Sequence, residues 1–276
     1  MKIMLVSTGR GAELCIFTSF VRKYREMYPD AEIVVGTGPT WKNLFINNKD
    51  ISKWVPSSDG EMQRQEATRA GFDVVEDISE ARGDDTSILD CMYKGIKDKR
   101  FQKGEIPRQV FITPSEKDNT QAKRLAKKYP GMILISHGCT SSKNALTHDG
   151  WVELSKRLAK YGPVCYTGTK GRGEMRGDPE LPDAVDLRDL SYGALAALSV
   201  IPGALRCFVG LDTATTWVCQ GTTARIVTLR CDPIYPLQST GMVSMGYRNE
   251  ANTKEIVVEG LDLAQILTLA ENAVAG

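Results

Sequence analysis

The 276-residue chain is long enough for two domains of ordinary size, and its 42% hydrophobic residues can form buried cores, which excludes a disordered protein. Lys and Arg total 35 against 34 Asp and Glu, a formal net charge of +1, so no strong overall field draws the chain to nucleic acid or to a membrane surface. The seven cysteines are widely spaced and form no Cys-x-x-Cys pair, which predicts buried thiols in a reducing compartment and argues against a metal site.

The N-terminal segment predicts the first part of a parallel sheet. Residues 2–7 form a short apolar run, which is too short for a signal-peptide core or a membrane span, so we expect a cytoplasmic protein without stable membrane insertion. A glycine loop follows, apolar residues then recur at helical spacing over 12–28, and 31–38 supplies a second strand. A helix of this length can connect two parallel strands. Further strand candidates are the apolar runs 72–77 and 109–114.

The second half of the chain repeats this design. Residues 115–131 begin with a capping pattern and predict a helix that links two halves. A strand and a polar loop follow it, and 151–162 predicts an amphipathic helix. Strands, loops and helices then alternate, so we predict an α/β protein with two doubly wound parallel sheets. The expected domains are 1–130 and 131–276.

The loop TGRGAE after the first strand places two glycines at a strand-to-helix turn, as dinucleotide-binding sites do. Leu14 occupies the third glycine position, and the second strand ends without an acid for a ribose hydroxyl, so an NAD-dependent oxidoreductase is a weak alternative. Glu13 remains as a carboxylate in the first turn of a helix. It either complements the helix dipole or acts as a general base in a ligand cleft.

Loops after the later strands carry groups that suit phosphate. Hydroxyls and one cation that could neutralise a diphosphate lie at Thr140, Ser141, Ser142 and Lys143, although a solvated loop with a surface lysine is the commoner outcome. The glycine loop 168–174 is either a flexible connection or the border of a nucleotide base or ribose. At 212–216 a strand-to-helix turn offers a capped helix start, whose bare N–H groups also suit a phosphate. Parallel sheets bring such loops to one edge, around a cleft.

Three stretches of the chain resemble glycosyltransferase family 9, the bacterial heptosyltransferases. These are 1–36, which includes the phrase YPDAEI, 133–168 with the hydroxyl-rich loop, and 185–230, which is similar to the family segment ending in Asp-Ser/Thr-Gly-x-x-His. The resemblance implies the GT-B fold, in which two Rossmann-like doubly wound domains face each other. It also implies that the last helix packs back on the first domain.

On this resemblance the chain is an inverting, metal-independent glycosyltransferase that moves a sugar from a nucleotide-diphosphate sugar to an acceptor hydroxyl. Glu13 falls on the family's catalytic aspartate, and Lys143 falls on its phosphate-contacting lysine. No cofactor is implied beyond the nucleotide-sugar co-substrate. The donor-binding residues would be Thr140, Ser141, Ser142, Gly168, Thr169, Asp212, Thr213, Ala214, Thr215, Thr216 and Trp217, and the acceptor side would include Arg10, Gly11 and Ala12.

Three positions depart from the family pattern. Glu13 replaces an aspartate, Ala214 a glycine and Trp217 a histidine. A glutamate keeps the carboxylate and moves it one methylene further, so the base role survives with a different geometry. Tryptophan lacks the charge and the acceptor nitrogen of histidine, but its ring can stack on a base or sugar and its N–H can donate. These positions predict an altered choice of donor or acceptor.

The acceptor implied by the resemblance is a glycan or glycolipid, and two alternatives remain. One is a phage-type transferase that acts on a hydroxymethylated base in DNA, since the Lys and Arg residues of 94–108 suit a phosphate backbone, although such runs are usually solvated faces. The other is a non-catalytic module that binds a sugar nucleotide or a partner, suggested by Ala214 and Trp217. The donor sugar, the nucleotide and the oligomeric state stay open.

Overall fold

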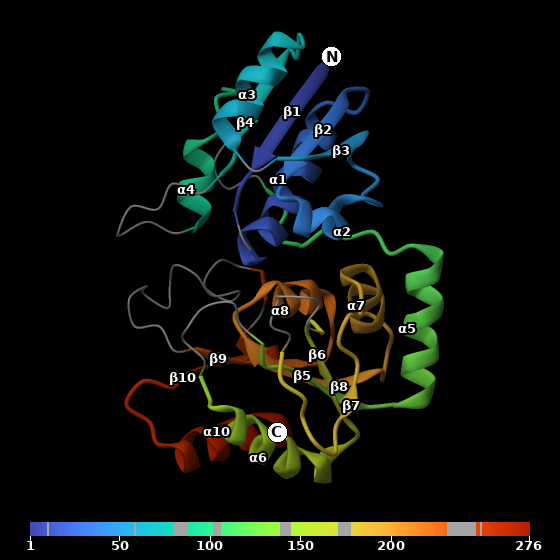
Figure 1. The fold of residues 1–276 in the computed structure, drawn as a ribbon, viewed down its shortest axis with the longest axis vertical. Coiled ribbons are helices and arrows are strands. Elements are labelled where there is room, and N and C mark those ends of the chain that lie inside the picture. Colours follow the sequence, from blue (N-terminus) through green and yellow to red (C-terminus); the bar gives the residue numbers. More distant parts are fainter. Residues whose placement is uncertain are drawn as a thin grey trace. The chain divides into compact units, whose positions relative to one another are not determined.

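The computed structural model describes residues 1–9, 11–57, 59–79, 88–101, 106–138, 145–170, 178–230, 247, 248 and 250–276. The chain divides into two compact α/β units, and it passes from unit 1 to unit 2 between Thr113 and Pro114 (Figure 1). Within the described ranges, no helix is long and apolar enough to cross a membrane.

Unit 1 contains a four-stranded parallel sheet of order β3-β2-β1-β4. Its strands β1 and β2 are buried from their second residue onward, as expected for parallel strands covered on both faces. The strands are β1 (Lys2–Ser7), β2 (Glu32–Thr37), β3 (Lys53–Pro56) and β4 (Val74–Asp77). The helices are α1 (Gly11–Met27), η1 (Pro39–Trp41), α2 (Lys42–Phe45), α3 (Gly60–Arg69) and α4 (Ile88–Lys94).

The apolar run 109–114 is not a strand, so this prediction was wrong, whereas the predicted strand at 72–77 is present as β4. The backbone of 109–114 pairs with side chains of α1 instead of with a neighbouring strand. The Ser19 hydroxyl donates to the carbonyl of Gln109 at 2.6 Å, and the N–H of Phe111 donates to the Thr18 hydroxyl at 2.8 Å. Because these backbone groups are satisfied, the segment needs no sheet.

Unit 2 contains a six-stranded parallel sheet of order β10-β9-β8-β5-β6-β7. Helices α6 and α10 lie side by side on one face of this sheet, and α5, α7 and α8 belong to the other (Figure 1). The strands are β5 (Met132–Ser136), β6 (Val164–Thr167), β7 (Val185–Asp186), β8 (Leu205–Leu211), β9 (Arg225–Arg230) and β10 (Thr253–Val257). The helices are α5 (Glu116–Lys128), α6 (His148–Leu158), η2 (Ala159–Tyr161), α7 (Tyr192–Ser199), α8 (Ala214–Val218), η3 (Cys219–Gly221), η4 (Glu250–Asn252) and α10 (Leu263–Ala275). Two parallel α/β sheets confirm the predicted fold class.

Helix α5 is part of unit 2, so the chain leaves unit 1 before this helix and not after residue 130, where the sequence suggested the boundary. Asp118 joins α5 to α7. Its carboxylate closes a capping box with Ser115 and accepts the hydroxyl of Ser191, which caps α7. A side chain at Gly193 would collide with this carboxylate, because an added Cβ would lie 2.4 Å from Asp118 Oδ2.

The last helix makes its contacts within unit 2. Helix α10 packs against α6 and against strands β9 and β10. The expected packing of this helix on the first domain stays a prediction. The side chains of its apolar face belong to the core cluster of unit 2, and they are Ile266, Leu267, Ala270 and Val274.

We expect Asp118→Ala to lower the free energy of unfolding of unit 2 by about 1–2 kcal/mol, since it removes both the capping box of α5 and the bond to Ser191. Urea unfolding measures this change. Glu116→Ala, at an exposed position in the same helical turn, is the control and should have little effect. Equal stability of Asp118→Ala and the unaltered protein would show that the capping box and the bond to Ser191 contribute nothing to stability.

Candidate functional site

The strand order reverses once in each unit, and ligands of open parallel sheets bind at such reversals, outside the carboxyl ends of the strands. In unit 1 the reversal lies between β1 and β4, and in unit 2 it lies between β5 and β8. The loop after β1 carries Glu13, and the loop after β8 carries Asp212 and Thr213. Glu13, Asp212 and Thr213 therefore follow strands that border the reversal of their own unit.

In unit 1 the loops after β1 and β4 are joined directly. The backbone N–H of Thr8 donates to the hydroxyl oxygen of Ser79 at 2.9 Å, and the two hydroxyls are 3.0 Å apart. Glu13 lies in the first turn of α1 and is only 9% exposed. Gly9 passes close to it, because an added Cβ would lie 3.0 Å from the Cβ of Glu13. The carboxylate is thus held at the reversal of unit 1.

The other predicted residues of these loops are placed in part. Gly11 begins α1 with a φ of 41°, a left-handed conformation that favours glycine, and Ala12 beside it is half-buried. Five predicted residues lie outside the described ranges, together with 171–174 of the glycine loop. They are Arg10, Thr140, Ser141, Ser142 and Lys143.

In unit 2 Trp217 is a buried partner of Asp212. Its indole N–H donates to Asp212 Oδ1 at 2.8 Å, and its ring packs edge-on against Tyr247 with 5.2 Å between centroids. The side chain is 0% exposed, so its ring offers no free face for a base or sugar in this structure. Asp212 Oδ2 lies 4.0 Å from the guanidinium of Arg230, which is itself buried at the end of β9. Asp212 is therefore fixed from two sides.

The remaining residues of the Asp212–Trp217 turn differ in the hydrogen bonds that their side chains make within the protein. The Thr216 hydroxyl donates to the carbonyl of Leu211, Ala214 is buried, and Thr215 is half-buried. Thr213 has the extended conformation of a cap, but its hydroxyl makes no cap bond. Its Oγ1 is buried without a hydrogen-bond partner among the described residues. The Thr213 hydroxyl is thus the group of this turn that is suited to a ligand.

A second group of polar residues lies at the carboxyl ends of β5 and β6, and sequence reasoning missed it. His137 directly follows β5, is 3% exposed, and its Nε2 lies 2.9 Å from the carbonyl oxygen of Pro179. Asp178 Oδ2 accepts the N–H of Thr169 at 2.6 Å. Burial lowers the pKa of His137, so the neutral imidazole is favoured. The sequence did contain a signal for His137, because a polar residue stands there between an apolar strand and a glycine.

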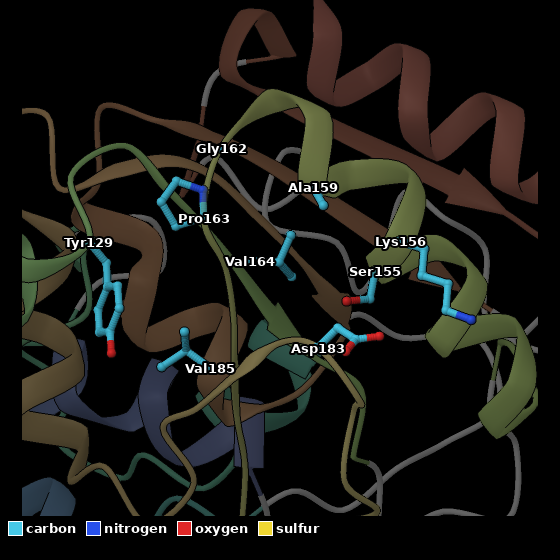
Figure 2. A pocket seen from close by; sticks show the side chains of 9 residues that line it. All are labelled: Tyr129, Ser155, Lys156, Ala159, Gly162, Pro163, Val164, Asp183 and Val185. Carbon is cyan, nitrogen blue, oxygen red and sulfur yellow. The ribbon is translucent and has the colours of Figure 1, made fainter.

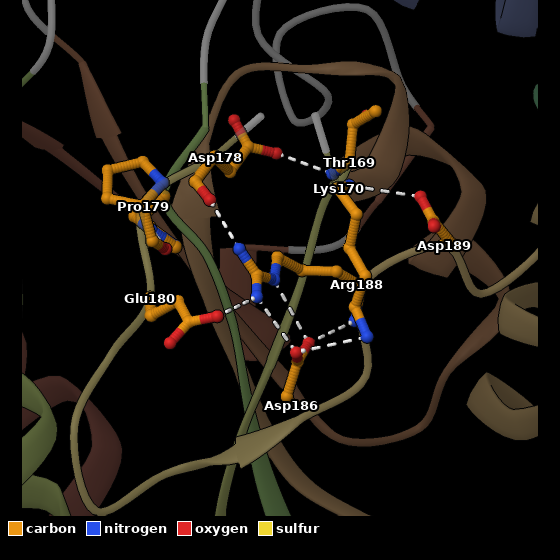
Figure 3. A network of polar contacts seen from close by, with 9 residues as sticks. Thr169, Lys170, Asp178, Pro179, Glu180, Asp186, Arg188 and Asp189 are labelled. Atoms are coloured by element: carbon orange, nitrogen blue, oxygen red, sulfur yellow. Dashed lines mark hydrogen bonds and ion pairs between the residues drawn. The ribbon is translucent and has the colours of Figure 1, made fainter. Parts of the chain in front are cut away.

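Arg188 organises the segment around Asp178 (Figure 3). It donates to the carbonyl of Asp178 at 2.7 Å, to Glu180 at 2.7 Å and to both oxygens of Asp186. These hydrogen bonds hold the pKa of Asp186 well below its usual range. The ammonium of Lys170 also lies 3.2 Å from Asp186 Oδ2, so the loop after β6 is tied to β7.

Two cavities among the described residues of unit 2 lie at the opposite edge of the sheet. A depression of about 470 Å³ is lined by Pro163 and Val164 at the start of β6, Val185 at the start of β7, and Lys156 of α6 (Figure 2). Another of about 420 Å³ adjoins the starts of β9 and β10. Neither lies at the reversal of strand order, where the polar side chains gather. We therefore base the candidate site on the loops and not on these depressions.

One arginine of the basic stretch 94–108, Arg100, makes ion-pair and ring contacts within unit 1. The Arg100 guanidinium donates to both oxygens of Asp98 and lies over the ring of Tyr28, 4.5 Å from its centroid. This residue thus makes the contacts of a structural arginine, and its geometry gives no specific support to binding of a DNA backbone.

No family model matches the sequence, and no curated protein matches it either. Solved structures match its fold over nearly the whole chain. A glycosyltransferase family 9 protein from Veillonella parvula is 10% identical with a TM-score of 0.66, covering 99% of this chain and 97% of that one. The E. coli ADP-heptose LPS heptosyltransferase II is 13% identical with a TM-score of 0.63, covering 100% and 99%. The E. coli heptosyltransferase WaaC with ADP is 11% identical with a TM-score of 0.62, covering 100% and 98%. The fold is thus that of glycosyltransferase family 9, as the sequence resemblance implied.

Trp217→Phe should lower the free energy of unfolding by about 1–3 kcal/mol, because it keeps a buried ring but leaves Asp212 without its indole donor. Urea unfolding followed by circular dichroism measures this. The control is Trp41→Phe, at a half-buried position of η1 in unit 1. Unchanged stability of Trp217→Phe would show that the bond to Asp212 contributes nothing.

Stability should also depend on pH through His137. Its pKa in the folded state lies below the ordinary value of 6.5, so below about pH 6.5 the unfolded chain takes up a proton that the folded chain does not. The free energy of unfolding should therefore fall between about pH 7.5 and about pH 5.5, and His137→Gln should reduce that fall. His148→Gln, at an exposed position, is the control. Identical pH dependence of all three proteins would refute a neutral, buried His137.

Proposed function

We propose that the chain is a glycosyltransferase that moves a sugar from a nucleotide-diphosphate sugar to an acceptor hydroxyl. One observation carries the proposal: a fold shared with glycosyltransferase family 9 is combined with polar side chains at the strand-order reversal of each unit. A carboxylate, Glu13, lies at the reversal of unit 1, and Asp212 and Thr213 lie at that of unit 2. The two units thus supply a base and a donor-binding turn.

Unit 2 would bind the donor. The Thr213 hydroxyl and the first N–H groups of α8 are hydrogen-bonding groups suited to a diphosphate, and Asp212, held by Trp217 and Arg230, would keep this turn in place. Lys143 would add a cation, as the sequence resemblance implies. Two of the similar structures are described with ADP or as acting with ADP-heptose, so ADP sugars are the first donors to test.

Unit 1 would supply the base. Glu13 would take the proton of the acceptor hydroxyl as that oxygen attacks the anomeric carbon, and the nucleoside diphosphate would leave from the opposite side, which inverts the configuration. The leaving diphosphate would be stabilised by N–H groups, hydroxyls and Lys143, without a metal ion. The acceptor would be a glycan or glycolipid. A cytoplasmic location is part of the proposal and agrees with the buried free cysteines of the described ranges, which are Cys15, Cys91, Cys165, Cys207 and Cys219.

The test is release of nucleoside diphosphate from a panel of UDP, ADP and GDP sugars in the presence of candidate acceptors and of EDTA. Glu13→Gln should lower kcat by about two to four orders of magnitude, because a general base contributes that much, while donor affinity stays close to that of the unaltered protein. The matched control is Glu26→Gln, an exposed glutamate on the same helix.

Full transfer activity in Glu13→Gln would overturn the base assignment. Loss of activity with EDTA, restored by a divalent cation, would overturn the metal-independent reaction. Absence of transfer with every donor, in a protein that still binds a sugar nucleotide, would favour a non-catalytic module.

A further inference from the structure

We propose that His137 and Asp178 form a pair of hydrogen-bond acceptors that recognises a vicinal diol of the donor, on its ribose or on the transferred sugar. The inference rests on the proposed function and names the ligand group that this part of unit 2 would select. Neither residue was among those predicted to bind the donor.

His137 supplies the first acceptor. A carbonyl oxygen can only accept, so His137 Nε2, at 2.9 Å from the Pro179 carbonyl, carries the hydrogen of that bond. In the neutral ring Nδ1 is then an acceptor. Nδ1 is buried, and no donor reaches it from the described residues. A buried acceptor without a donor is costly, and a ligand hydroxyl would remove that cost.

Trp151 makes a hydroxyl the best-matched ligand group. Its indole Nε1 is a buried donor that also has no partner among the described residues, and its ring centroid is 6.0 Å from that of His137. A hydroxyl can donate to His137 Nδ1 and accept from an N–H at the same time. An anionic phosphate oxygen can only accept, so it would leave the imidazole nitrogen unsatisfied.

Asp178 supplies the second acceptor. Its Oδ2 accepts the N–H of Thr169, and no described residue donates a hydrogen bond to its Oδ1. The carboxylate fits between two glycines, since an added Cβ would lie 1.8 Å from Oδ1 at Gly138 and 2.1 Å from Oδ2 at Gly168. Its negative charge disfavours phosphate and favours a ligand that donates hydrogen bonds.

The two acceptors are held together by the chain itself. Asp178 immediately precedes Pro179, whose carbonyl binds His137, and the carbonyl of Asp178 is fixed by Arg188 at 2.7 Å (Figure 3). Both therefore lie at the carboxyl ends of the neighbouring strands β5 and β6, with β5 also forming one side of the reversal. Neighbouring, fixed acceptors match two adjacent hydroxyls of one sugar ring.

Calorimetric binding tests the pair with three probes: the nucleoside diphosphate of the best donor, its 2′-deoxy analogue and the full nucleotide sugar. If the diol is on the ribose, the unaltered protein should bind the ribonucleotide about tenfold more tightly than the deoxy analogue. Asp178→Asn and His137→Gln should each reduce that preference. If the diol is on the transferred sugar, both variants should instead weaken binding of the nucleotide sugar by about tenfold relative to the nucleoside diphosphate.

The matched control is Glu180→Gln, which alters a neighbouring carboxylate that binds only the Arg188 side of the network. The diol pair alone would be overturned if Asp178→Asn and His137→Gln have the melting temperature of the unaltered protein and bind all three probes with unchanged affinity, or with affinity weakened equally for all three. Failure of the unaltered protein to bind any of the probes would overturn the proposed function and the pair with it.

Discussion

In unit 2 the strand order reverses between β5 and β8, so the connections that follow these neighbouring strands leave the sheet in opposite directions. This constraint determines where polar groups can gather, because the rest of the sheet edge is covered by the chain's own crossovers. Thr213 follows β8 with a buried hydroxyl oxygen that has no partner among the described residues, and His137 follows β5 with a buried ring nitrogen in the same condition. Two buried polar atoms without a hydrogen-bond partner among the described residues therefore lie at the carboxyl edge of this sheet.

Trp217 stands where the sequence resemblance places a histidine, and its side chain is accommodated in the core of unit 2. The resemblance places a histidine there, and the tryptophan instead fills the core against Tyr247 and donates to Asp212. Asp212 therefore keeps a fixed orientation although the imidazole is gone. The turn after β8 is therefore held in place by contacts of Asp212 with Trp217 and Arg230.

The sequence predicted the elements whose signals are local. The apolar run of β1 appears where expected, and the amphipathic helix predicted at 151–162 is present as α6, which begins three residues earlier at His148, because buried parallel strands and helix faces leave periodic patterns in the sequence. The run 109–114 failed because side chains of α1, remote in sequence, satisfy its backbone. Asp178 was missed for the same reason, since only the fold brings its carboxylate against Gly138 and Gly168. The burial of Trp217 likewise depends on tertiary packing that spacing does not reveal.

Binding of a nucleotide sugar is the claim on which the account depends, and thermal unfolding in the presence of UDP, ADP and GDP sugars tests it most directly. A donor at about 100 times its dissociation constant should stabilise the protein by roughly 2.7 kcal/mol and raise the melting temperature accordingly. We expect at least one of these donors to do so, and the same donor to act less strongly on Thr213→Val. A melting temperature that none of the nucleotide sugars shifts would contradict the account.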